Sequence, residues 1–170
     1  ADAVARGLNA GGADVLRIGT CGTAEVYFAT SHLGAAGGIM VTASHNPADW
    51  NGMKLVREGS RPISGDTGLN EIRALAEAGV FPAVAAPGRS SAAAPFGAYL
   101  DHLLTYVDAR ALRPLKVVVN AGNGGAGHVI DGLESRLPFT FIKLQHEPDG
   151  TFPHGVPNPL LPGNRQVTSD

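Results

Sequence analysis

The residues best suited to chemistry gather around one serine. In the segment 38–47, Ser44 stands just beyond the end of a predicted strand. Open α/β sheets have their binding sites outside the carboxyl ends of their strands. Beside this hydroxyl lie a proton carrier, His45, and an amide that both donates and accepts, Asn46, and a cation, Lys54, follows further along the chain. These residue types can support a nucleophilic serine with a proton carrier and a positive charge nearby.

Residue types alone leave two alternatives to a reactive serine. Ser-His-Asn-Pro is equally compatible with a simple polar turn, because all four residue types favour turns. A hydrolytic serine fits less well, since the sequence has no Gly-x-Ser-x-Gly elbow and no identifiable acid partner for His45.

Strands and helices alternate along the chain in the pattern of an α/β protein. Apolar runs and helical periodicity predict a first set of elements, with helices at 1–9, 24–33 and 69–78 and strands at 15–18, 39–42 and 53–56. A second set has helices at 98–107 and 129–137 and strands at 115–119 and 139–144. Asp66 or Thr67 is the expected N-cap of the helix 69–78. Both sets contain βαβ units.

A weakly charged segment separates the two sets. Residues 79–95 are mostly Ala, Pro, Gly and Ser, the composition of a connector, so we place a domain boundary near Pro95. The end of the chain, 156–170, is expected to be a loop punctuated by Pro and Gly. Because residues 1–9 already form a helix, the chain is expected to begin inside a domain.

Composition excludes several classes of partner. The 170 residues are 44% hydrophobic, with 13 Lys and Arg against 15 Asp and Glu and a net charge of −2, so no excess of positive charge is available for nucleic acid. No apolar run approaches the ~20 residues of a membrane span, and the N-terminus lacks a signal-peptide pattern. The single cysteine, Cys21, cannot form an internal disulfide, and the sequence therefore predicts a cytoplasmic protein without a membrane or nucleic-acid partner.

The serine segment resembles the active-site signature of the α-D-phosphohexomutases. The matching residues are Thr42-Ala43-Ser44-His45-Asn46-Pro47, followed by Asn51-Gly52-Met53-Lys54. Further matching stretches are Ile18-Gly19, Gly22-Thr23, Val26-Tyr27-Phe28-Ala29-Thr30, the segment 57–68 and Asp149-Gly150-Thr151-Phe152-Pro153. Within the family these stretches are similar to bacterial phosphomannomutases, which supply GDP-mannose for surface polysaccharides, and to phosphomannomutase/phosphoglucomutases.

The resemblance implies a function for the serine loop. Ser44 would be the phosphoserine, Lys54 the nearby base or cation, and His45 and Asn46 substrate-binding supports of the loop. Such enzymes interconvert hexose 6-phosphate and hexose 1-phosphate through a 1,6-bisphosphate and bind Mg²⁺, to which this chain would contribute the Ser44 phosphate. The preference for mannose, with glucose as a second substrate, rests on resemblance alone.

The resemblance also implies that the chain is part of a larger enzyme. It implies three-layer α/β/α domains with mixed sheets, with 1–95 as the later part of domain 1 and 96–170 as the start of domain 2. The family's metal-binding Asp-Gly-Asp-Gly-Asp-Arg loop, sugar-reading loop and phosphate-binding C-terminal domain are not in this sequence. The chain alone is therefore expected to be inactive, and the remaining domains of the same enzyme are its expected partners.

A glycine-rich turn supports a different hypothesis. The segment 122–127 matches Gly-x-Gly-x-x-Gly after a strand and before a helix, and Glu147 follows further on, as in the nucleotide-binding domain of a Rossmann-type oxidoreductase. However, Glu147 is expected beyond the next strand, and the phosphohexomutases have a similar Asn-Gly turn with a packing role. The six histidines have no ligand spacing typical of zinc. A non-catalytic binding module remains a third hypothesis.

Overall fold

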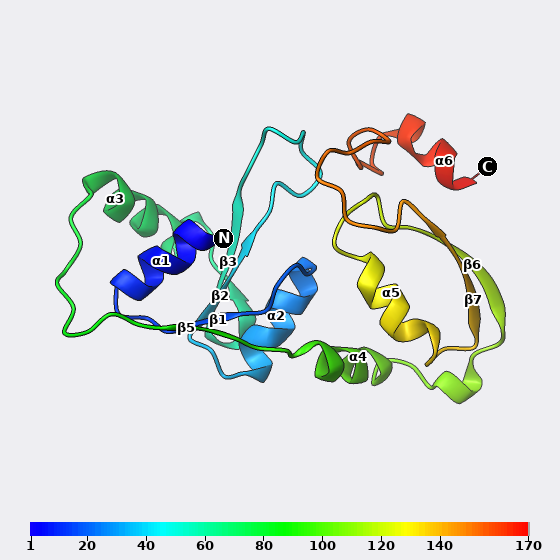
Figure 1. The fold of residues 1–170 in the computed structure, drawn as a ribbon, viewed down its shortest axis with the longest axis horizontal. Coiled ribbons are helices and arrows are strands. Elements are labelled where there is room, and N and C mark those ends of the chain that lie inside the picture. Colours follow the sequence, from blue (N-terminus) through cyan, green and yellow to red (C-terminus); the bar gives the residue numbers. More distant parts are fainter. Residues whose placement is uncertain (170) are drawn as a thin grey trace. The chain divides into compact units, whose positions relative to one another are not determined.

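The computed structural model describes residues 1–169, in which strands and helices alternate along the chain (Figure 1). One sheet pairs β1 (Val15–Arg17) with β5 (Ser90–Ala92) in parallel. Another contains β2 (Gly37–Val41), β3 (Met53–Arg57) and β4 (Arg61–Pro62), with β3 and β4 antiparallel. A third pairs β6 (Leu115–Asn120) with β7 (Phe139–Leu144) in parallel. The predicted α/β class with mixed sheets is confirmed.

The chain divides into two compact units. The first contains Ala1–Gly19, Thr23–Val41 and Lys54–Pro95, and the second contains Thr20–Gly22, Thr42–Met53 and the chain from Phe96 onward. The assignment of residues 1–95 to the later part of one enzyme domain and of 96–170 to the start of the next stays a prediction.

The core of the first unit lies between α2 (Thr23–His32) and the strands β2 and β3. Val26 and Ala29 of α2 are buried, and Val56 of β3 is 3% exposed. A Cβ at Gly38 would clash with the Thr30 hydroxyl and lie 3.1 Å from Val26, so β2 packs closely on the helix because it begins with glycines. The other helices of this unit are α1 (Asp2–Ala10), η1 (Glu58–Ser60), η2 (Gly65–Leu69) and α3 (Asn70–Ala78).

Two details of the first unit differ from the sequence prediction. Asp66 and Thr67 do not cap α3, because Asp66 accepts a hydrogen bond from the Ser64 hydroxyl and Thr67 shares a capping box with Ser64 at the start of η2. The segment 79–95 is more than a connector, since it contains β5. The Val15 N–H of β1 donates to the carbonyl of Arg89 at 2.8 Å, just before β5, and the pairing of the two strands continues along β5.

In the second unit, α4 (Phe96–Leu104) packs on α5 (Gly127–Glu134). Leu100 of α4 is 4% exposed, and a Cβ at Gly132 of α5 would lie 2.5 Å from its side chain, so the glycine allows the close approach. The expected C-terminal loop instead contains η4 (Pro162–Arg165) and α6 (Gln166–Ser169), and η3 (Ala109–Ala111) precedes β6. Among the described residues, no helix has the length and apolar character needed to cross a bilayer.

Candidate active site

The serine lies in a loop that leaves β2 and returns at β3. The base of the loop is closed by a backbone hydrogen bond of 2.9 Å from the Thr42 N–H to the Gly52 carbonyl. Inside it, the Asn46 N–H donates to the Ala43 carbonyl at 3.1 Å, and the Trp50 N–H donates to the Pro47 carbonyl at 3.0 Å. Successive turns therefore shape this loop, while its tip, residues 44–51, is exposed.

Ser44 has an unusual backbone conformation. Its φ of 57° lies in the left-handed region, which costs a residue with a Cβ free energy that its surroundings must supply. The Ser44 N–H donates to the Thr42 hydroxyl at 2.9 Å, and the exposed Ser44 Oγ lies 3.2 Å from His45 Nδ1. The structure thus brings a serine hydroxyl and an imidazole together in one constrained loop.

The other two predicted site residues are Asn46, in the same loop, and Lys54, on β3. The Asn46 side chain is exposed, and its backbone N–H forms the turn to Ala43. Lys54, on β3, donates from Nζ to the Thr23 hydroxyl at the start of α2, at 3.4 Å. Lys54 and Ser44 belong to different compact units, and the approach of the ammonium to the serine stays a prediction.

In the glycine-rich turn after β6, the chain itself uses the backbone donors that could otherwise bind a pyrophosphate. The Gly122 N–H donates to the Asn120 side chain at 2.9 Å, the Asn123 N–H to the Gln145 carbonyl at 2.7 Å, and the Gly124 N–H to the Ala121 carbonyl at 3.0 Å. A dinucleotide site needs these N–H groups directed at the ligand.

The glycines of this turn fit a packing role. A Cβ at Gly122 would lie 2.7 Å from Pro157, one at Gly125 would lie 3.0 Å from the Cys21 carbonyl, and one at Gly127 would clash with the His146 carbonyl. Glu147 lies past the end of β7, and its carbonyl accepts from the Asn123 side chain at 2.9 Å. Close approach of protein segments therefore accounts for the motif.

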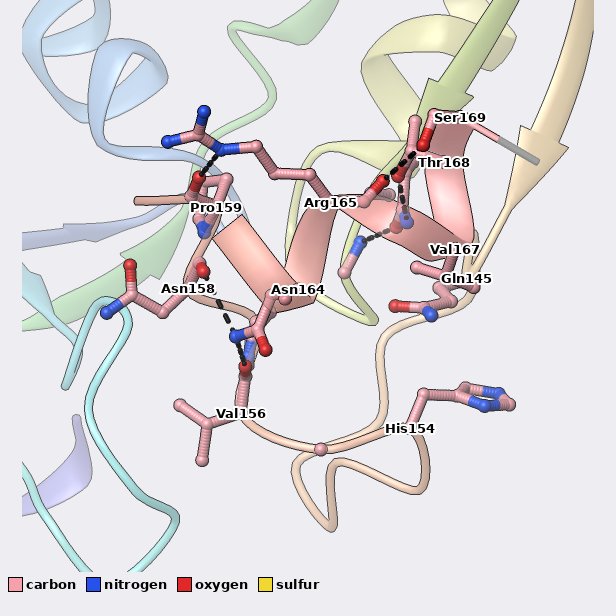
Figure 2. A pocket seen from close by; sticks show the side chains of 16 residues that line it. Gln145, His154, Val156, Asn158, Pro159, Asn164, Arg165, Val167, Thr168 and Ser169 are labelled. Atoms are coloured by element: carbon pink, nitrogen blue, oxygen red, sulfur yellow. Dashed lines mark hydrogen bonds between the residues drawn. The ribbon is translucent and has the colours of Figure 1, made fainter. Parts of the chain in front are cut away.

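A hollow of about 830 Å³ lies beside the carboxyl ends of β6 and β7 (Figure 2). Asn120 donates to the Thr168 hydroxyl at 2.9 Å, Asn164 donates to the Asn158 carbonyl at 3.0 Å, and Arg165 Nε donates to the Pro159 carbonyl at 2.7 Å. These polar side chains join the walls to one another. Ser44, His45, Asn46 and Lys54 do not line it.

Comparison with known proteins identifies the family. Residues 1–82 match the family described as phosphoglucomutase/phosphomannomutase, alpha/beta/alpha domain I, and residues 97–169 match its domain II. The chain belongs to the phosphoglucomutase/phosphomannomutase family. Neither this membership nor the geometry of the glycine-rich turn supports the oxidoreductase alternative.

Relatives in the family are much longer than this chain. A phosphomannomutase of Salmonella montevideo is 60% identical, and the match covers 98% of this chain and 38% of that relative. A protein of Xanthomonas campestris pv. campestris named for phosphohexose mutases is 58% identical, and the match covers 99% of this chain and 38% of that relative. A solved structure of a family protein from Burkholderia thailandensis superposes with a TM-score of 0.84 at 33% identity, over 98% of this chain and 37% of that one. The chain therefore spans about 38% of these relatives.

A metal ion was expected from the resemblance to this family. Among residues 1–169, no three His, Cys, Asp or Glu side chains gather in a way that could hold one. The described residues do not by themselves fit a Mg²⁺ site, because a hard divalent cation takes six or more oxygen ligands, and a Ser44 phosphate would supply few of them.

Thr42 supports the serine loop through contacts that the sequence prediction did not include. Thr42 was part of the matched signature but had no role of its own. Its hydroxyl accepts from the Ser44 N–H, and its own N–H closes the base of the loop. The signal was present in the sequence, since Thr hydroxyls often bond backbone groups two residues away in turns.

Proposed function

We propose that this chain is the nucleophile-carrying part of a phosphohexomutase that interconverts hexose 6-phosphate and hexose 1-phosphate. Ser44 carries the phosphoryl group between turnovers, and a hexose 1,6-bisphosphate is the intermediate. The observation that carries the proposal is the exposed Ser44 hydroxyl, held in a left-handed turn 3.2 Å from His45 Nδ1, in a chain of this family.

The chemistry requires a proton balance at both oxygens. When phosphoserine donates, a sugar hydroxyl forms the new O–P bond while the bond between phosphorus and Ser44 Oγ breaks. The sugar hydroxyl loses its proton, and Ser44 Oγ gains one. The bisphosphate then turns around, and the reverse transfer of its other phosphoryl group leaves the isomeric monophosphate and restores phosphoserine. Catalysis of such a transfer depends on positioning and on cations that neutralise charge.

The loop residues have roles that follow from their chemistry. Whichever tautomer it adopts, His45 Nδ1 is within hydrogen-bonding reach of Ser44 Oγ, where the proton must arrive or leave. Lys54 is proposed to stabilise the charge of the transferring group, and to act as a base only while the phosphate is on the sugar, because an adjacent phosphate favours the ammonium. Asn46 is proposed to support the loop and the bound sugar.

The finer parts of the proposal concern the intact protein. Mannose phosphate is the proposed substrate, with glucose phosphate as a second one, because similar proteins are named phosphomannomutases and phosphohexose mutases. Mg²⁺ is the proposed cofactor, and EDTA should abolish activity that added Mg²⁺ restores. The proposed location is the cytoplasm, where hexose phosphates occur. The chain 1–170 alone is proposed to be inactive, and turnover above about 1 s⁻¹ in a coupled assay would contradict this.

The decisive experiment uses the full-length protein and its Ser44→Ala variant. Incubation with glucose 1,6-bisphosphate should add one phosphoryl group to the parent, located at Ser44 by peptide mass spectrometry, and none to the variant. Mutase activity toward mannose 1-phosphate should fall at least ~10³-fold, because the covalent carrier is lost. Ser135→Ala, an exposed serine at the end of α5, is the matched control. Activity of Ser44→Ala within tenfold of the parent would refute the proposal.

A further inference from the structure

Thr42 links the conformation of the nucleophile to the base of its loop. Its hydroxyl accepts from the Ser44 N–H at 2.9 Å, and its backbone N–H donates to the Gly52 carbonyl at 2.9 Å. The second bond joins the two ends of the loop, and the first fixes the peptide that precedes the Ser44 Cα. One residue thus connects the frame of the loop to the serine.

The left-handed conformation of Ser44 makes this link consequential. A serine at φ 57° returns to the extended or right-handed region unless other contacts hold it. The turn from the Asn46 N–H to the Ala43 carbonyl spans Ser44 without bonding its amide, and His45 Nδ1 contacts only its side chain. The Thr42 hydroxyl is therefore the acceptor that restrains the Ser44 amide directly.

We propose that Thr42 is a positioning residue for phosphoryl transfer by Ser44; this inference rests on the proposed function. By holding the Ser44 amide, Thr42 keeps Oγ and its phosphoryl group directed out of the loop, in line with the attacking hydroxyl. It also occupies an N–H that the phosphate, a strong acceptor, would otherwise bind. Because in-line transfer depends steeply on geometry, release of this amide slows the chemical step more than it weakens sugar binding.

Two substitutions test the role of the hydroxyl in the full-length protein. Thr42→Val removes the acceptor and keeps the β-branched volume, and Thr42→Ser keeps the acceptor. Thr42→Val should lower kcat about 10- to 100-fold with KM for the sugar phosphate within about threefold, and Thr42→Ser should stay within about threefold of the parent in both. Thr140→Val makes the same chemical change at an exposed position of β7 and should change neither.

Hydrogen exchange of the Ser44 amide provides a readout that does not depend on activity. Ser44 is exposed, so loss of its hydrogen bond in Thr42→Val should speed exchange of this amide at least about tenfold, with the thermal midpoint within about 2 °C of the parent. If Thr42→Val does not fold, Thr42→Ala removes the same acceptor with less volume and replaces it in both measurements.

The outcomes separate this inference from the proposed function. Unchanged exchange, or an unchanged kcat in a variant whose Ser44 is still phosphorylated, would overturn the role of Thr42. Equal losses in Thr42→Val and Thr42→Ser, together with a lower thermal midpoint, would show a purely structural role and also overturn it. Full activity of Ser44→Ala would instead refute the proposed function and, with it, any positioning of Ser44 for catalysis.

Discussion

The serine loop after β2 and the glycine-rich turn after β6 each contain a non-glycine residue in the left-handed region. In the serine loop this residue is Ser44, and its side chain faces solvent. In the glycine-rich turn it is Asn123, whose N–H and side chain both bond the segment after β7. The left-handed backbone leaves the side chain exposed to solvent in the first turn and bonds it to a neighbouring segment in the second. A sequence motif therefore indicates a binding site only when its polar groups are not already bonded within the protein.

If the serine loop serves catalysis and the glycine-rich turn serves packing, substitutions near the first should lower turnover. The largest such loss among the predictions below is expected at Lys54, which follows the serine loop. Lys54→Met should lower turnover of the full-length protein at least ~10²-fold, because a charge-stabilising group is lost, and leave the fold intact. Steady-state kinetics and circular dichroism measure both parts. Lys116→Met, an exposed lysine on β6, is the control. Near-normal turnover of Lys54→Met would reduce Lys54 to a solvated surface charge.

In the glycine-rich turn a substitution should affect stability and leave catalysis unchanged. Gly127→Ala places a Cβ against the His146 carbonyl, and overpacking against backbone should lower the free energy of unfolding by about 1–3 kcal/mol. Urea denaturation measures this loss, and kcat of the folded variant should stay within twofold of the parent.

The control for Gly127→Ala is a glycine with open space around it. Gly97 lies in α4, and apart from its chain neighbours and the backbone of its own helix no heavy atom lies within 4 Å of its Cβ position, so Gly97→Ala should be neutral or stabilising by up to about 1 kcal/mol. If Gly127→Ala were equally well tolerated, packing would not explain the motif.

The smallest expected effect concerns charges that support the packed turn. Asp131 on α5 accepts hydrogen bonds from Lys143 at 2.7 Å and from His146 at 2.9 Å, and these bonds, that of Lys143 first, lower the pKa of the Asp131 carboxyl below 3.8. A lowered folded-state pKa adds stability above the unfolded pKa of about 4, which is lost as the pH falls through the folded value.

Asp131→Asn should therefore destabilise the protein at pH 7 by less than Gly127→Ala, and the difference from the parent should shrink below about pH 4. Urea midpoints at pH 7, 4 and 3 measure this trend. Glu147→Gln removes an exposed carboxylate nearby and is the control. A difference that stays constant down to pH 3 would show that the carboxylate charge does not contribute.

The sequence predicts elements with a clear apolar pattern well. It predicts poorly the strands that lack such a pattern and the hydrogen bonds for which neighbouring polar side chains compete. The strand 139–144 was predicted with its observed bounds, because alternating apolar residues fit a pleated strand. The β5 strand, Ser90–Ala92, was missed because three small residues have no hydrophobic periodicity, and their pairing with β1 depends on a partner far away in the chain.

The same limit applies to hydrogen-bonded turns and to the site. Asp66 and Thr67 have the right side chains for an N-cap, but Ser64 engages both before α3 begins. Ser44 and His45 were candidates from their types and spacing, and the resemblance to the phosphohexomutases favoured them over a simple polar turn. The hydrogen bond from the Ser44 N–H to Thr42 is common for threonine in turns, but the left-handed backbone of Ser44 that this bond restrains is not revealed by spacing.

The serine loop also contains Trp50, the single tryptophan of the sequence, which is 61% exposed. The backbone N–H of Trp50 donates to the Pro47 carbonyl, so the residue that bears the indole belongs to the turn that follows Ser44. Intrinsic tryptophan fluorescence of this chain therefore arises from the serine loop alone. Its emission maximum and its quenching by iodide therefore offer a test of the proposed phosphorylation of Ser44 in real time, without a label or a coupled assay.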